Sequence, residues 1–193
     1  MQLSQFIKVF KPSSNLTKGS KEQIADYKDY LPQCILELWS EHGFGTYGDG
    51  LIQIINPDLY KENLWGWLMT DEDLTRIPVA ISALGDIFYY RQLDDEGSED
   101  IAYIDPHTSA TGVLAWSAEE FFNEWCCDEE VISDFFRKEE VKDVEQLKGS
   151  LTHDEIYYYT PALRLGGTPS IITMDRGNAL AQLDILLQLA LDS

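Results

Sequence analysis

The chain has 193 residues, of which 44% are hydrophobic, enough apolar material for one large domain or two small ones. It carries 34 acidic residues against 14 Lys and Arg, a formal net charge of −20. Free DNA, free RNA and anionic membrane surfaces are therefore poor expected ligands, because clustered Lys and Arg bind them. A basic protein is the natural complement of such a chain, and solubility is the other use of such acidity.

The acidic residues are concentrated in one part of the chain. Residues 1–30 hold five lysines and three acids, a net charge of +2. Residues 51–136 hold nineteen acids and three basic residues, a net charge of −16. Acidity that serves solubility can be spread anywhere, whereas a binding surface is local. The distribution therefore favours a binding surface.

Targeting signals and cysteines point to the cytoplasm. No stretch approaches the roughly 20 apolar residues that span a bilayer. The first residues, MQLSQFIKVFKPSSN, lack the pattern of a signal peptide. The chain has three cysteines, two of them adjacent at Cys126 and Cys127, which does not suit a disulfide framework.

The first third of the chain is predicted to be mainly helical. Apolar spacing predicts a short helix over residues 2–10 and a helix that starts at Pro32 and ends near His42. The glycine-rich segment 43–50 is predicted to be a structural turn, since it lacks the Lys-Ser/Thr of a phosphate-binding loop and precedes a strand. That strand, residues 51–55, is apolar enough to be buried on both faces.

Asn56-Pro57 then predicts the start of a helix that runs to about Met69. From Ile77 the period changes to that of strands. The segments IPVAISAL, DIFYYRQL, IAYID and VLAW predict a four-stranded antiparallel meander, with an acidic hairpin tip at residues 94–100.

The last third mixes helices and strands. Ser117 and Glu120 form a capping box that starts a helix burying Phe121, Phe122 and Trp125. A second helical stretch is predicted near residues 129–138, and strands within 154–167 and 169–175. The final segment, NALAQLDILLQLAL, is almost wholly apolar and is predicted to be a helix enclosed by the core. The whole chain is predicted to be α+β, with a mixed, mainly antiparallel sheet flanked by helices.

No pattern predicts a catalytic or metal site. His42 is expected at a helix end and His107 in a surface turn, away from any nucleophile motif. His153, Asp154 and Glu155 are neighbours whose side chains point apart, so one metal ion cannot take all three.

Two patterns in the sequence imitate enzymatic sites. Asp134 with Glu140 and Lys142 imitates a D…E-x-K nuclease pattern, but it falls in a polar segment rather than on a core strand. Paired carboxylates together with five tryptophans and ten tyrosines would also suit a hydrolase or carbohydrate-binding module. That module is kept as the alternative function.

Three resemblances go beyond these patterns. Residues 30–60, YLPQCILELWSEHGFGTYGDGLIQIINPDLY, resemble the GAD-like domain of bacterial proteins. ALGDIFYY, IAYIDPHT, the Ser117-capped helix and DEIYYYTPALRLGG resemble the C-terminal domain of type VI secretion DNase immunity proteins. The early order of helix, glycine turn and strand is also similar to the immunity superfamily named for yeast cell-wall regulators and the Syd protein (SMI/KNR-Syd).

The resemblance implies a cytoplasmic immunity protein that binds and inhibits a cognate toxin, in particular a nuclease, and that is not an enzyme and needs no cofactor or metal. It implies a GAD-like segment at 1–75 and an immunity-type domain at 76–193, expected to share one core. A housekeeping adaptor of the same fold is the third hypothesis. The oligomeric state and the identity of the toxin stay open.

Contact residues are chosen on charge alone, since no motif marks them. The candidates on the hairpin are Asp94, Asp95, Glu96, Glu99 and Asp100. Those of the helical region are Glu119, Glu120, Glu124, Asp128, Glu129 and Glu130. Aromatic residues are expected to supply desolvated anchors, and charge to steer the association.

Overall fold

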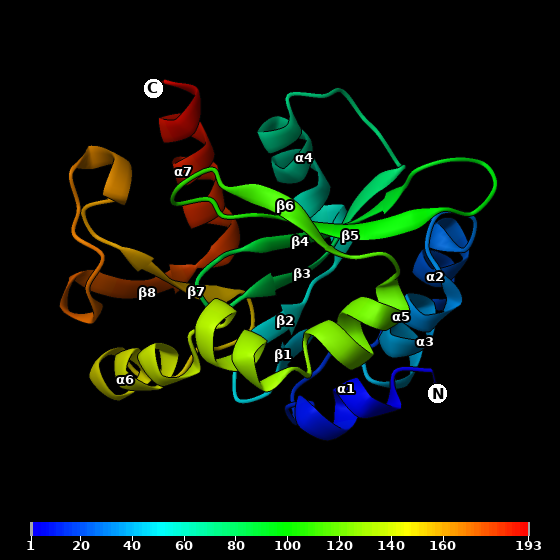
Figure 1. Cartoon of the computed structure of the whole chain (residues 1–193), viewed down its shortest axis with the longest axis horizontal. Helices are drawn as coiled ribbons and strands as arrows, with labels where there is room; N and C mark the ends of the chain where they lie inside the picture. The colour runs from blue at the N-terminus through cyan, green and yellow to red at the C-terminus, as the bar shows by residue number, and fades with distance from the viewer. Residues whose placement is uncertain (1, 193) are drawn as a thin grey trace.

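A six-stranded antiparallel sheet organises the computed structural model, which describes residues 2–192 (Figure 1). The strands follow chain order across the sheet: β1 (Gly45–Tyr47), β2 (Ile52–Ile54), β3 (Arg76–Ser82), β4 (Ile87–Gln92), β5 (Glu99–Ile104) and β6 (Thr111–Ala115). A second, two-stranded sheet pairs β7 (Glu155–Tyr159) with β8 (Met174–Asn178). The predicted α+β class and the antiparallel meander are confirmed.

Helices cover both faces of the large sheet (Figure 1). One face packs against α1 (Ser4–Val9), α2 (Lys21–Tyr27), α3 (Gln33–Glu41), α5 (Ala118–Glu120), the π-helical turns η1 (Phe121–Trp125) and η2 (Val131–Phe135), and α6 (Lys138–Lys148). The other face packs against α4 (Pro57–Leu68) and α7 (Ala179–Leu191). The connection from β7 to β8 contains two 3-10 turns, η3 (Leu163–Leu165) and η4 (Ile171–Thr173).

Strand periodicity produces these two cores. Successive side chains of a strand point to opposite faces. On β4, Phe88 and Tyr90 join the core under α1, α3 and α5, whereas Ile87 and Tyr89 join the core under α4 and α7. The middle of the sheet is therefore buried on both sides, which explains its nearly continuous apolar sequence.

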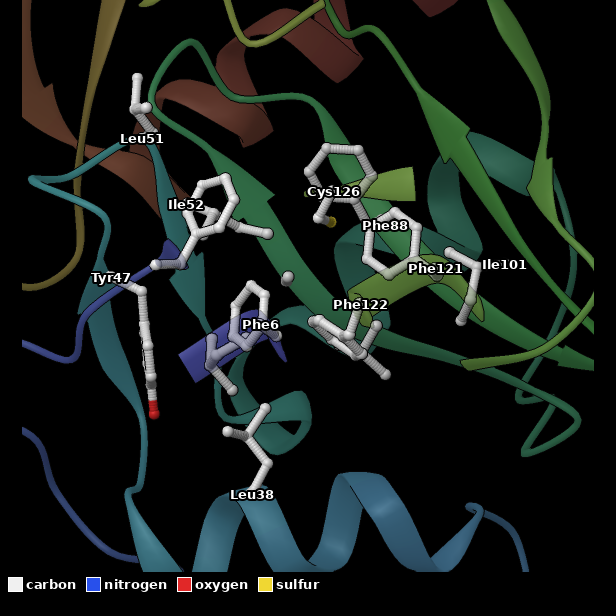
Figure 2. Close-up of a cluster of buried hydrophobic side chains, with 14 of the residues drawn as sticks. Phe6, Leu38, Tyr47, Leu51, Ile52, Phe88, Ile101, Phe121, Phe122 and Cys126 are labelled. Atoms are coloured by element: carbon white, nitrogen blue, oxygen red, sulfur yellow. The ribbon is translucent and has the colours of Figure 1, made fainter. Parts of the chain in front are cut away.

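Aromatic rings fix the segment after β6 on the sheet. The ring of Phe88 lies 5.3 Å from that of Phe121, 5.9 Å from those of Phe135 and Phe136, and 6.3 Å from that of Trp125, between centroids. Figure 2 shows Phe88 and Phe121 side by side in this core. Burying each such side chain contributes about 1.5–3 kcal/mol. The acidic helical segment is thus anchored from beneath by its own aromatic residues.

The glycine-rich segment 43–50 contains strand β1 as well as a turn, so its prediction as a turn alone was incomplete. Tyr47 is fully buried and its hydroxyl donates to the carbonyl of Gly43 at 2.6 Å. Gly48 has a φ of 58°, and a Cβ there would meet Cδ1 of Phe10 at 2.4 Å. The glycines serve backbone geometry and close packing.

Helix caps follow the sequence prediction. The Asn56 side chain accepts a hydrogen bond from the Asp58 amide at 3.1 Å, with Pro57 in the first turn. Ser117 Oγ accepts from the Glu120 amide at 3.1 Å. The Glu120 carboxylate, however, accepts from the Trp116 amide rather than from that of Ser117.

Two predictions for the last third were wrong. Residues 171–173 form the 3-10 turn η4, and β8 starts only at Met174. Helix α7 is not enclosed: Leu183 and Leu186 are buried, but Ile185 and Leu191 are 48% and 61% exposed. The helix lies at one side of the molecule (Figure 1), and its residues Ala179 and Leu183 belong to the same core as Leu64 of α4.

The large sheet runs across the position where the sequence placed a boundary between residues 75 and 76. There β2 pairs with β3, Ile52 opposite Ser82 and Ile54 opposite Ala80. Within residues 2–192, no helix is long and apolar enough to cross a membrane.

Candidate protein-interaction surface

The tip of the β4–β5 hairpin presents three exposed carboxylates, on Asp94, Asp95 and Glu96. The Leu93 amide donates to the Ser98 carbonyl at 2.8 Å, which closes the loop. Asp94 Oδ1 accepts from the amides of Glu96 and Ser98, each at 2.9 Å. Hydrogen bonds from Ser98 lower the pKa of Asp94, so the Asp94 carboxyl group is ionised at neutral pH.

The two acids at the base of the hairpin serve the fold. The Asp100 side chain is 1% exposed and accepts two hydrogen bonds from Arg91, at 2.7 and 2.6 Å. The prediction of Asp100 as a surface contact was therefore wrong. Asp100 lies opposite Arg91 in the β4–β5 register, and its side chain is buried. Half-buried Glu99 accepts from the Tyr90 hydroxyl at 3.1 Å and from the Ala118 amide at 3.0 Å.

The helical acids also divide into structural and exposed groups. Half-buried Glu120 accepts from the Trp116 amide at 2.8 Å. Asp128, in the turn before η2, accepts hydrogen bonds from the amides of Glu130 and Val131, at 2.9 and 3.1 Å. The candidates of this region with exposed side chains are Glu119, Glu124, Asp128, Glu129 and Glu130.

An apolar pair lies where the hairpin meets the start of α5. Trp116 is 68% exposed and Leu93 is 47% exposed. Together with Gly97, Ser98, Glu99 and Ser117 they line an open depression of about 620 Å³. Sequence reasoning expected aromatic anchors but named neither residue, because it chose the contact residues on charge alone. The available signal was the position of Trp116 between the end of a strand and a helix cap.

The structure does not bring all the candidates to one depression. Glu129 lines a separate one with Gln5, Val9, Cys127 and Lys138, among others. Because Lys138 belongs to that depression, its charge is mixed. The hairpin tip and the start of α5 therefore form the more uniformly acidic part of the candidate surface.

Two further buried ionisable groups, Asp86 and His107, meet the β3–β4 turn away from the candidate surface. Asp86 is buried, and this burial raises its pKa to about 6, although the Ser82 hydroxyl donates to its carboxylate at 2.5 Å. His107 was predicted at the surface and is in fact buried, with Nε2 3.0 Å from the Leu84 carbonyl oxygen. Burial lowers the pKa of His107, so the ring is neutral at pH 7. Both groups are packed at this turn, and neither lines the depressions that contain Trp67, Trp116 or Glu129.

A hydrolase or carbohydrate-binding site would need aromatic side chains beside two convergent carboxylates. The depression with Trp116 contains one carboxylate, that of Glu99, and both of its oxygens accept hydrogen bonds. The depression between α4 and α7 contains Trp67 and is otherwise mainly apolar. Within residues 2–192, no group of three His, Cys, Asp or Glu side chains could hold a metal ion.

Two family models match this chain. The family model described as "GAD-like domain" matches residues 1–99, just over half of the 193 residues. The chain belongs to the GAD-like domain family. A second model, "T6SS immunity protein Tdi1, C-terminal", matches residues 117–190 of this GAD-like protein, T6SS denoting the type VI secretion system. The resemblances to the GAD-like domain and to the C-terminal domain of a type VI immunity protein are confirmed, but the segment ALGDIFYY, which was assigned to the second domain, falls within the GAD-like match.

The fold has a counterpart among solved structures. The crystal structure of Atu4351 from Agrobacterium tumefaciens superposes with a TM-score of 0.73 at 21% identity, over 96% of this chain and 88% of that one. At this identity the likeness shows a shared fold. No curated protein sequence matches the chain.

Proposed function

We propose that this GAD-like protein is a cytoplasmic immunity protein that binds a cognate type VI secretion toxin and blocks it. The match of residues 117–190 to the C-terminal domain of a type VI immunity protein carries the proposal. That region includes the aromatic-anchored helical segment and five exposed acidic candidates. The protein therefore acts by binding, and its own side chains perform no chemistry on a substrate.

The toxin we propose is a DNase, covered at its DNA-binding face. A surface that binds DNA carries clustered Lys and Arg. Residues 51–136 of this chain carry a net charge of −16, which complements such a surface. The exposed carboxylates of the hairpin tip and of α5 would occupy positions that DNA phosphates otherwise take. Long-range attraction between the two surfaces speeds their encounter.

A protection assay in cells tests the function. The toxin encoded by the neighbouring gene is expressed from an inducible promoter in a host that lacks this chain, with and without the chain supplied in trans. We expect killing and DNA loss without the chain, and survival with it. A matched control expresses an unrelated acidic protein of similar size, which should not protect.

Two outcomes would contradict the proposal. Killing that is equal with and without the chain, at confirmed expression of both proteins, would remove the immunity role. Protection accompanied by intact DNA in both cultures would keep the immunity role and remove the DNase.

A further inference from the structure

We infer that Trp116 and Leu93 form the apolar centre of the toxin-binding surface, and that they receive a basic, arginine-bearing face of the toxin. This inference rests on the proposed function and adds to it the position of the contact. The starting observation is exposure: Trp116 is 68% exposed, whereas Trp39 is 0% exposed and Trp65 is 7% exposed. Tryptophan is among the residues most often found at the energetic centre of protein interfaces.

Hydrogen bonds hold the chain at Trp116 and at the two residues that follow it. The Trp116 amide donates to Glu120 Oε2 at 2.8 Å, and Ser117 Oγ accepts from the Glu120 amide at 3.1 Å. The Ala118 amide donates to Glu99 Oε1 at 3.0 Å, which ties the start of α5 to the hairpin. An anchor that is already ordered before binding loses less conformational entropy when the complex forms.

Leu93 supplies the second apolar residue from across the depression. It follows β4 directly, and its amide is fixed by the Ser98 carbonyl at 2.8 Å. Trp116 and Leu93 line one open depression together with Gly97 and Ser98. An apolar pair within a polar rim is the arrangement of a protein-interaction hot spot.

The acidic charge around this depression indicates that the partner surface is basic. No Lys or Arg occurs between Arg91 and Arg137, and this interval holds thirteen acidic residues. The side chains of Asp95 and Glu96, two and three positions after Leu93 in the sequence, are exposed, and in the part of the chain that the structure describes neither makes a hydrogen bond or an ion pair. Because like charges repel, an acidic partner is excluded. A guanidinium can stack on the indole face and pair with these carboxylates, so arginine suits the depression best.

A binding measurement on the full chain tests this inference. The toxin encoded by the neighbouring gene is produced in a catalytically inactive form, and its Kd is measured by calorimetry at 0.15 M NaCl. We expect Trp116→Ala to weaken binding by at least about 30-fold, and Leu93→Ala by about 5-fold. Met69→Ala and Ile172→Ala are matched controls, since these side chains are 83% and 79% exposed at other positions. Each control should change the Kd less than about 3-fold.

The outcomes separate this inference from the proposed function. If the wild type binds and Trp116→Ala binds equally well, the inference is wrong and the proposed function stands. If the wild type does not bind the toxin, both fail. Sedimentation of the chain alone completes the test: a dimer that Trp116→Ala dissociates, with toxin binding unchanged, would assign the depression to a second copy and overturn the inference. Because Trp116 is largely exposed, its substitution is expected to leave the melting temperature unchanged, and Leu93→Ala provides an independent variant.

Discussion

The buried pair Arg91–Asp100 offers the sharpest test of how the fold supports the acidic hairpin. The Asp100 side chain is 1% exposed and that of Arg91 is 27% exposed, with two hydrogen bonds at 2.7 and 2.6 Å. Removing one partner of a buried ion pair typically costs about 3–5 kcal/mol, because the other charge is left unpaired. Since Arg91 is partly exposed, water can reach the Asp100 carboxylate when Arg91 is removed. We therefore expect Arg91→Ala to cost about 3 kcal/mol, at the lower end of that range.

The assay is urea unfolding followed by tryptophan fluorescence, with thermal unfolding in parallel. A loss of about 3 kcal/mol corresponds to a fall in Tm of about 6–12 °C for a chain of this size. Lys142→Ala is the matched control: its ion pair with Glu139 is 3.6 Å long and both side chains are mostly exposed, so we expect a loss below about 1 kcal/mol. The double variant Arg91→Met/Asp100→Leu should recover at least half of the loss. Equal losses for Arg91→Ala and Lys142→Ala would refute the reasoning.

Two further predictions concern charge. Folding raises the pKa of Asp86 to about 6 from 3.8, so the folded protein binds a proton more tightly than the unfolded chain and loses stability as pH rises from about 4 to 6. Asp86→Asn should therefore be more stable than the wild type at pH 7.5, by up to about 3 kcal/mol. Urea unfolding at pH 5 and pH 7.5 measures this difference, and a free energy of unfolding that is the same for the two proteins at both pH values would contradict the prediction. The double variant Asp95→Asn/Glu96→Asn should lower the association rate with the toxin several-fold at 50 mM NaCl, and much less at 0.5 M NaCl, because salt screens the attraction. Stopped-flow mixing measures this rate. A change confined to the dissociation rate would contradict electrostatic steering.

Local signals in the sequence predicted much of the fold. Asn56-Pro57 and Ser117 mark helix starts because capping depends on residues a few positions apart. The meander from β3 to β6 was readable because its alternation and its turns are local as well. The prediction that helix α7 is enclosed by the core was wrong because it depends on distant segments. The helix is almost wholly apolar in composition, but the number of its sides that are covered is set by residues far away in the sequence.

The candidate surface likewise combines features that depend on local sequence with features that depend on contacts far apart in the sequence. Charge could identify the hairpin tip at Asp94–Glu96, because exposed acids on a loop tip need no tertiary knowledge. It could not identify Asp100 as buried, since that depends on the cross-strand position of Arg91. Nor could it find Trp116, whose exposure follows from the way β6 ends beside the hairpin. The burial of His107 under the β3–β4 turn depends likewise on contacts far apart in the sequence.

Stoichiometric inhibition is the most direct test of the central claim. The purified toxin of the neighbouring gene is incubated with plasmid DNA at 0.15 M NaCl, and DNA cleavage is followed while the full chain is added in increasing molar ratio. The account predicts that cleavage falls in proportion to added chain and stops near a ratio of one to one, and that Trp116→Ala shifts this titration to much higher ratios. Full cleavage at a tenfold excess of the wild-type chain would contradict it.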